Sequence, residues 1–187
     1  MQVVSWTPVA GGICAYGDRD QLCPVPTLVW TITPVTWSQC GRTPPPGICP
    51  TAPVTGLTFQ EATALAVEIG GRLPMSVEWE WMATGHSQRR YPWGDEEWIP
   101  ERANLRGSSR GQPTPVDLHP AGITPDGLFD VAGNVWEWTS TQIVGHGSII
   151  RGGSYNSLPV YARGKFLNAA PHELTSGGIG VRVVRDL

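Results

Sequence analysis

The residues best suited to chemistry are four cysteines, and all of them lie near the start of the chain. Cys14, Cys23, Cys40 and Cys49 form no CxxC motif, and no histidine stands near them at the spacing of a metal ligand. This pattern argues against a structural zinc site. Four cysteines allow three disulfide pairings, and the sequence does not choose between these pairings and free buried thiols. Sulfur chemistry is therefore restricted to the opening segment.

The histidines and acidic residues complete no catalytic pattern. His86, His119, His146 and His172 are spread over loops, without the i, i+3 or i, i+4 pair that binds one metal ion. The acidic cluster at 95–97 is typical of a solvated turn, and no Ser/His/Asp or paired-carboxylate motif stands out. The residue types alone thus predict no catalytic centre.

The bulk composition is that of one globular domain. A chain of 187 residues with 40% hydrophobic and 16% charged residues can bury a substantial core. The net charge of −3 and the pI near 5.8 give no electrostatic case for nucleic acid or an anionic membrane. No apolar run is long enough to span a bilayer, and the N-terminal sequence lacks the order of a signal peptide. We therefore expect no nucleic-acid partner and no membrane span.

The elements that position any site must be short. The chain holds 23 Gly and 18 Pro, which favour turns, and 9 Trp, which can pack ordered loops in place. Residues 58–71 predict a helix, because Thr58 and Glu61 form a capping box and two glycines end the stripe. Residues 76–85 predict a second helix with large side chains on more than one face. The class is therefore α+β, with two helices and extensive ordered loops.

Two strands are indicated in the C-terminal half. In GNVWEW the tryptophans Trp136 and Trp138 alternate about Glu137, and we expect both to pack in the core. The segment IGVRVV predicts a half-buried strand, with Val181 and Val183 on one face and Arg182 and Val184 on the other.

Five motifs, taken in order, resemble a known family. GRLPMSVEWEWMATG, YPWGDE, GLFDVAGNVWEWTS, RGGSY and GIGVRVVR are similar in order and spacing to the formylglycine-generating enzyme, or sulfatase-modifying factor, family. The resemblance covers nearly the whole chain, so it implies a single domain over residues 1–187. It also implies a variant of the C-type lectin fold, with a small twisted antiparallel sheet, two helices and extensive ordered loops.

The resemblance also bears on activity. Oxidising members of the family use a cysteine pair between the RGGS turn and the closing strand, where this chain has YNSLPVYARGKFLNAAPHEL and no cysteine. Serine and tyrosine cannot replace a thiolate in metal binding or disulfide exchange. The sulfoxide synthases of the family use three histidines from a helical domain that this sequence does not contain. We therefore expect no enzyme and no redox cofactor.

The segment FDVAGNVWE resembles a calcium loop of the family. By position, Asp130 and Glu137 would supply carboxylates, and Gly133 and Val135 would supply backbone carbonyls, to a structural Ca²⁺. The alternative is that both carboxylates accept hydrogen bonds from turn amides. A second family calcium site would begin at Asn104, but the loop that follows lacks the aspartate it needs.

The segment 151–187 is similar in position to the variable region of proteins diversified by retroelements. Those proteins are non-catalytic binders displayed on a virion or cell surface, and their diversified residues follow from adenine mutagenesis of AAC codons. We therefore expect this face to bind a protein or other macromolecular receptor, and Lys165 and Glu173 to be invariant positions. Alternatives are a loop whose apolar residues pack inward, a degenerate family domain, and an active oxidoreductase. The candidate ligand-binding residues are Tyr155, Ser157, Leu158, Val160, Tyr161, Phe166, Leu167, Asn168, His172, Leu174 and Ser176.

Overall fold

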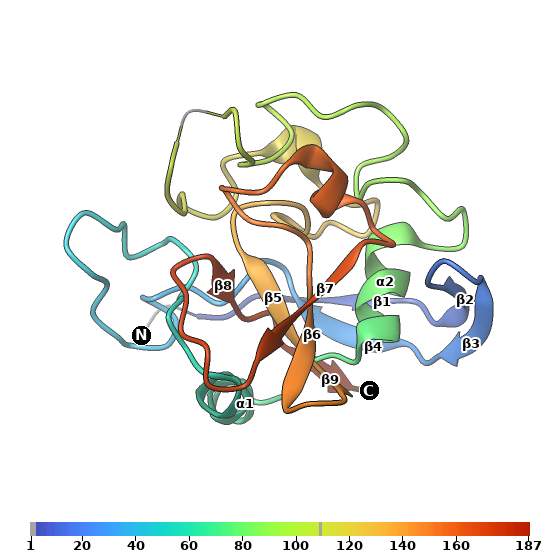
Figure 1. Ribbon diagram of the computed structural model, residues 1–187, viewed down its shortest axis with the longest axis horizontal. Helices are drawn as coiled ribbons and strands as arrows, with labels where there is room; N and C mark the ends of the chain where they lie inside the picture. The colour runs from blue at the N-terminus through green and yellow to red at the C-terminus, as the bar shows by residue number, and fades with distance from the viewer. Residues whose placement is uncertain (1–2, 109) are drawn as a thin grey trace.

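The computed structural model describes residues 3–108 and 110–187, and within these ranges the chain forms three small sheets and two α-helices (Figure 1). The opening strands agree with the turn-broken pattern of the sequence. The first and fourth pair antiparallel, and the second and third form a hairpin. Their bounds are β1 (Trp6–Val9), β2 (Gly12–Tyr16), β3 (Gln21–Val25) and β4 (Leu28–Thr31).

The C-terminal half builds a four-stranded sheet in the order β7-β6-β5-β8. The expectation of an antiparallel sheet is wrong at one edge, where β8 runs parallel to β5. A parallel pair needs a long connection, and the chain from β5 through β6 and β7 to β8 provides it. The bounds are β5 (Trp136–Ile143), β6 (Gly147–Arg151), β7 (Leu167–Pro171) and β8 (Ile179–Gly180).

The closing sequence IGVRVV is divided between two sheets rather than forming one strand. After β8 the chain leaves the four-stranded sheet, and β9 (Val184–Asp186) pairs with β4 in the three-stranded sheet β1-β4-β9. Arg182, Val181 and Val183 are all fully buried. The half-buried pattern is wrong here because a buried carboxylate, described below, lies opposite Arg182.

Both predicted helices are present. In α1 (Phe59–Glu68) the backbone N–H of Glu61 donates to Thr58 Oγ1 at 3.3 Å, and Glu61 Oε2 accepts from the backbone N–H of Thr58 at 2.9 Å. The helix α2 (Ser76–Thr84) is buried on nearly every side, because it contacts the β2–β3 hairpin as well as β5 and β6. In the described part of the chain no helix is long and apolar enough to cross a membrane.

Tryptophans occupy the centre of the core, as expected for Trp136 and Trp138. Trp30, Trp79 and Trp138 are fully buried. The indole N–H of Trp138 donates to the carbonyl of Leu57 at 3.2 Å, so its polar group is satisfied away from water.

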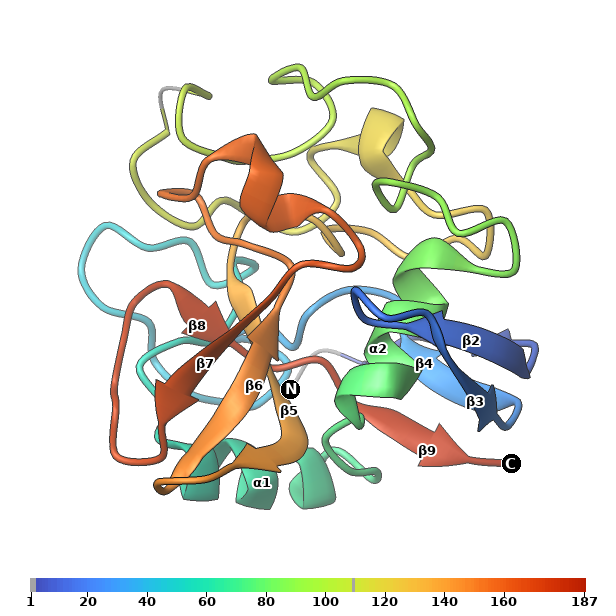
Figure 2. The same ribbon diagram turned by 45° about the vertical axis from the view of Figure 1, so that its right-hand side comes forward.

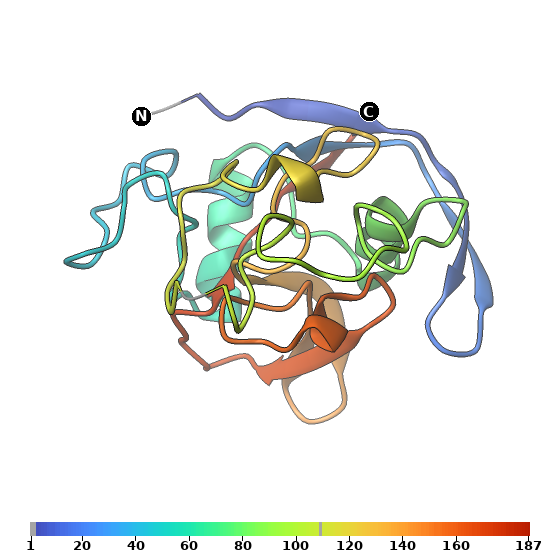
Figure 3. The same ribbon diagram turned by 90° about the horizontal axis from the view of Figure 1, so that it is seen from above.

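The long loops gather at one end of the molecule. In Figures 1 and 2 the green-to-yellow chain and the orange 3₁₀-helix η2 (Pro159–Ala162) lie at the top, and α1 lies at the bottom. Figure 3 shows the same loops from above. Backbone hydrogen bonds of 2.9 Å join the C-terminal segment to these loops, from Arg106 N to Ser157 O and from Gly164 N to Arg90 O. The C-terminal segment therefore rests on other ordered loops.

Candidate ligand-binding surface

The segment predicted to bind a ligand begins at a tight turn. Gly152 and Gly153 follow β6 with positive φ values of 95° and 75°. A Cβ at Gly152 would lie 2.7 Å from the carbonyl oxygen of Val131 and 3.2 Å from the Trp79 ring. Only glycine fits this approach without strain, so the RGGS motif fixes the direction in which the chain leaves the sheet.

Five of the eleven predicted residues have exposed side chains, and we call them the tail surface. Four of them are aliphatic. The fifth, Asn168, is polar and lies on β7. The aliphatic members and their exposed fractions are Leu158 (44%), Val160 (38%), Leu167 (42%) and Leu174 (40%).

The aromatic residues of the segment are half-buried, and Tyr161 and Phe166 pack against the core. Tyr161 and Phe166 meet edge to face with ring centroids 4.8 Å apart. Both also lie against Trp136, at 6.5 and 6.4 Å. His172 stacks on Phe59 with centroids 4.4 Å apart. Each of these side chains therefore packs partly inward, as the alternative prediction held, and remains partly exposed. Tyr155 and Ser176 are half-buried as well.

Ser157 does not face outward, in contrast to its assignment as a contact residue. Its side chain is buried, and its hydroxyl oxygen accepts from the backbone N–H of Ser154 at 2.9 Å. This bond closes the turn after RGGS. Ser157 therefore shapes the loop, and the local sequence did not reveal on which side of the turn it would lie.

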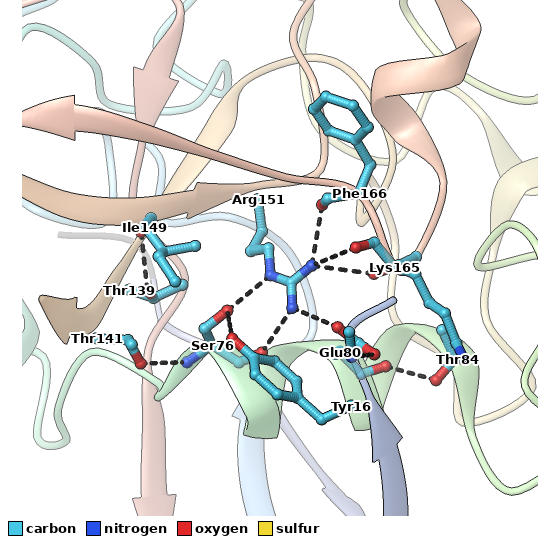
Figure 4. Close-up of polar contacts among 12 residues, drawn as sticks. Tyr16, Ser76, Glu80, Thr84, Thr139, Thr141, Ile149, Arg151, Lys165 and Phe166 are labelled. Atoms are coloured by element: carbon cyan, nitrogen blue, oxygen red, sulfur yellow. Dashed lines mark hydrogen bonds and ion pairs between the residues drawn. The ribbon is translucent and has the colours of Figure 1, made fainter. Parts of the chain in front are cut away.

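A buried arginine holds the segment to the helix α2 (Figure 4). Arg151 and Glu80 are both fully buried, and Arg151 Nη2 lies 2.5 Å from Glu80 Oε2. Arg151 Nε donates to Ser76 Oγ at 2.9 Å. Arg151 Nη1 donates to the carbonyls of Lys165 and Phe166 at 3.1 and 2.9 Å. One guanidinium therefore joins the end of β6, the start of α2 and the backbone that precedes β7.

The same cluster connects the β2–β3 hairpin to the segment. Tyr16 Oη donates to Ser76 Oγ at 3.0 Å, and the backbone N–H of Gly17 donates to Glu80 Oε1 at 2.8 Å. On the outside, Lys165 Nζ forms an ion pair with Asp20 at the hairpin turn. From its sequence RGGS was predicted only as a turn, and the one available signal of the buried cluster was a glutamate inside a helix with large side chains on more than one face.

A second buried ion pair lies at the other end of the segment. Arg182 Nε lies 2.9 and 3.1 Å from the two carboxylate oxygens of Glu137. Trp79 Nε1 donates to Glu137 Oε2 at 2.5 Å, and Arg182 Nη2 donates to the carbonyl of Phe129 at 2.7 Å. Burial raises the pKa of Glu137, and the nearby Arg182 opposes that rise. The segment is thus held by a buried arginine at each end.

The residues predicted to bind calcium differ in whether their oxygen atoms already have partners within the protein. Asp130 Oδ2 accepts from the backbone N–H of Asp117 at 3.0 Å, while Oδ1 is buried without a hydrogen-bond partner. The carbonyl of Gly133 accepts from Val135 N at 2.8 Å. Glu137 would have to leave Arg182 before it could bind a cation. The calcium site therefore stays a prediction, and Asp130 is the member with a free oxygen.

Sulfur and imidazole groups do not gather into a metal centre. All four cysteines are free thiols, although Cys14 and Cys23 stand directly opposite each other in the β2–β3 hairpin. Burial raises the pKa of Cys14 to about 12, so this thiol stays protonated. In residues 3–108 and 110–187 no group of three or more His, Cys, Asp or Glu side chains could hold a metal ion.

Comparison with known families decides which family this fold represents. Residues 12–187 match the model of the sulfatase-modifying factor enzyme 1-like domain. The chain belongs to this family. The fold predicted from the motifs, an α+β domain of the formylglycine-generating enzyme and C-type lectin type, is confirmed by this match and by the solved structures below.

Relatives by sequence are named for enzymatic activities. The chain is 36% identical over 139 residues to hercynine oxygenase of Mycobacterium tuberculosis, covering 62% of this chain and 32% of the relative. It is 29% identical over 172 residues to formylglycine-generating enzyme of Streptomyces coelicolor, covering 73% of this chain and 54% of the relative. The prediction that the chain is no enzyme is therefore contradicted, because the family to which it belongs includes enzymes. It spans about a third of the hercynine oxygenase.

Solved structures of the same fold include a variable protein and a tropism determinant. Treponema denticola variable protein 1 superposes with a TM-score of 0.82 at 17% identity, covering 99% of this chain and 97% of that chain. PvdO from Pseudomonas aeruginosa gives 0.81 at 20% identity, covering 97% and 94%. The Major Tropism Determinant U1 variant gives 0.57 at 13% identity, covering 85% and 50%. At these identities the likeness establishes the fold.

Proposed function

We propose that this domain binds a protein ligand through the tail surface. The observation that carries the proposal is the exposure of four aliphatic side chains in residues 158–174, a segment with a buried ion pair at each end. A contiguous group of exposed apolar side chains marks an interaction site, whereas single ones do not, and we infer that these four form one such group. They are Leu158, Val160, Leu167 and Leu174.

Rigidity makes this surface suitable for recognition. A loop that is already ordered loses little conformational entropy when a partner binds, so more of the contact energy appears as affinity. The half-buried rings of Tyr155, Tyr161 and Phe166 leave part of their aromatic area exposed for contact. The surface therefore combines firm support with the residue types that protein interfaces use.

The structural neighbours support the same role. One is named a variable protein and another a tropism determinant, and the first shares the fold over nearly its whole length. We propose that residues 155–176 correspond to a variable recognition region. A near-copy of this coding segment close to the gene, differing at adenines, is the expected genetic counterpart.

Site-specific photo-crosslinking in the source cells tests the binding face. A photoreactive phenylalanine at Leu158 or Leu167 is expected to give discrete adducts with one protein, whereas the same residue at Val67 on α1, 66% exposed, is expected to give none. Leu158→Arg and Leu167→Arg should abolish binding of the identified partner, and the matched variant Val67→Arg should bind normally. Equal crosslinking from Val67, or binding unaffected by both tail variants, would refute the proposal.

A second candidate follows from the sequence relatives. Identity of 36% to a hercynine oxygenase favours a role as the family domain of an oxygenase. The histidines and carboxylates of the described residues do not form an iron site by themselves, so such an activity would need donors from elsewhere. Oxygen consumption that depends on hercynine and ferrous iron, measured with an oxygen electrode on the protein as expressed from its full gene, would support this candidate. A rate equal to that without hercynine would exclude it.

A further inference from the structure

A cavity of about 570 Å³ lies between the β1–β2 connection, the C-terminal end of α2 and the loop at 125–126. Its volume is in the range of small-molecule pockets. None of its lining residues belongs to the tail surface. The wall is mostly apolar, with charged groups at separate points, and includes Val9, Gly12, Ile13, Trp81, Arg89 and Asp126.

Arg89 supplies the guanidinium of this cavity, whose wall also includes His86, and the charge of Arg89 is poorly compensated. Its Nη2 donates to the carbonyl of Ala83 at 3.2 Å, while Nε is buried without a hydrogen-bond partner. Among the described residues no carboxylate lies within ion-pair distance of Arg89. Burial lowers the pKa of Arg89, in line with a guanidinium short of partners. A half-buried cation in this condition favours an anionic ligand.

Asp126 supplies the opposite charge on the same wall. Its side chain is exposed, and it lies near enough to Arg89 to act on its pKa but forms no ion pair with it. A purely anionic ligand would approach Arg89 against the charge of Asp126. A ligand that carries both an anion and a cation would be attracted by both groups.

The indole of Trp81 completes the apolar part of the cavity. Its Nε1 donates to the carbonyl of Ala10 at 2.8 Å, which fixes the ring. A Cβ at Gly12 would meet the Trp81 ring at 2.4 Å, and a Cβ at Gly85 would meet Arg89 Nη1 at 2.7 Å. Both glycines thus leave room for the groups that line the cavity. A side chain at Gly12 would displace the Trp81 ring, and one at Gly85 would displace the Arg89 guanidinium.

We propose that this cavity binds a free α-amino acid with an apolar side chain. The carboxylate pairs with Arg89, the ammonium group pairs with Asp126, and the side chain lies against Trp81 and Val9. This site is separate from the tail surface and does not depend on the function proposed for it.

Titration of the ¹⁵N-labelled protein with L-leucine tests the proposal. Saturable shifts are expected at the amides of Gly11, Gly12 and Ile13. Arg89→Gln should weaken binding about 10-fold or more, because a charge-assisted hydrogen bond is lost. Asp126→Asn, at an exposed position that the fold tolerates, should also weaken it. The matched control is Arg19→Gln, on the exposed hairpin turn, which should bind leucine as the wild type does.

Two leucine derivatives separate the charge requirements. N-acetyl-L-leucine lacks the ammonium group and L-leucine amide lacks the carboxylate, so each is expected to bind more weakly than L-leucine. No saturable shift up to about 10 mM L-leucine, well above the range of specific small-molecule sites, would overturn the proposal. Equal binding of N-acetyl-L-leucine, or unchanged binding by Asp126→Asn, would overturn it as well.

Discussion

Replacing Arg151 by methionine is expected to destabilise the domain and loosen the tail surface together. The substitution keeps much of the aliphatic volume but removes the guanidinium. Glu80 then stays buried without its cation, since both side chains are fully buried in the folded protein. The carbonyls of Lys165 and Phe166 lose their donor as well.

The size of the effect follows from burial. Removing one partner of a buried ion pair costs about 3–5 kcal/mol, and we take about 4 kcal/mol as the expected loss for Arg151→Met. In a domain of this size that loss corresponds to a fall in Tm of roughly 8–16 °C. An exposed arginine gives a matched control, and Arg19→Met should change stability by less than about 0.5 kcal/mol.

Urea unfolding at neutral pH measures the loss, and a double variant separates charge from packing. Glu80→Met with Arg151→Met removes both charges, so it should be clearly more stable than the sum of the two single variants predicts. Hydrogen exchange should accelerate at the amides of Gly164 and Phe166 in the single variant. A loss below about 1 kcal/mol, or strict additivity in the double variant, would refute the reasoning.

Three further predictions concern single groups. Without calcium, Asp130→Asn should raise stability at neutral pH, because burial raises the pKa of Asp130 and the folded state favours its protonated form. The gain should vanish below about pH 4, where the carboxyl is protonated in both states; urea unfolding at both pH values checks this, and a pH-independent gain would contradict it. If Asp130 binds calcium, about 10 mM calcium chloride should raise the Tm of the wild type but not of the variant, and equal shifts would argue against the site. N-ethylmaleimide at neutral pH should label Cys49 before Cys14, since burial raises the pKa of Cys14 to about 12 and hydrogen bonding to Thr51 lowers that of Cys49. Mass spectrometry of timed samples measures the order, and simultaneous labelling would show that the buried thiol is accessible.

The parts of the fold that could be predicted from the sequence are those fixed by neighbouring residues. The capping box of Thr58 and Glu61 indicated the start of α1, and the structure contains both of its hydrogen bonds. The alternation of Trp136 and Trp138 indicated β5 and the burial of both rings. In each case the deciding contacts lie within a few positions along the chain.

The parts that could not be predicted depend on distant residues. Glu80 and Arg151 stand 71 positions apart, and neither sequence context shows that the other will lie beside it. Arg182 and Glu137 are also far apart in the sequence, and their pairing explains why the closing segment is buried on both sides. Ser157 was misplaced because a turn hydrogen bond, rather than a periodic pattern, determines its direction.

The prediction about activity failed for a different reason. The missing cysteine pair and the missing three-histidine site bear on two reactions of the family, whereas the 36% identity to the hercynine oxygenase of Mycobacterium tuberculosis extends over 62% of the chain. The absence of particular residues therefore did not place the chain outside a family that includes enzymes.

The two buried arginines have a consequence for how this protein can change. Arg151 and Arg182 fix the backbone at both ends of the tail surface through carboxylates that face the interior. Substitutions of outward residues such as Leu158 or Leu174 therefore act far from the contacts that hold the fold, and their effects on stability should be small and nearly additive. Under the proposed function, selection for a new partner would change the outward side chains while the backbone that presents them stays the same.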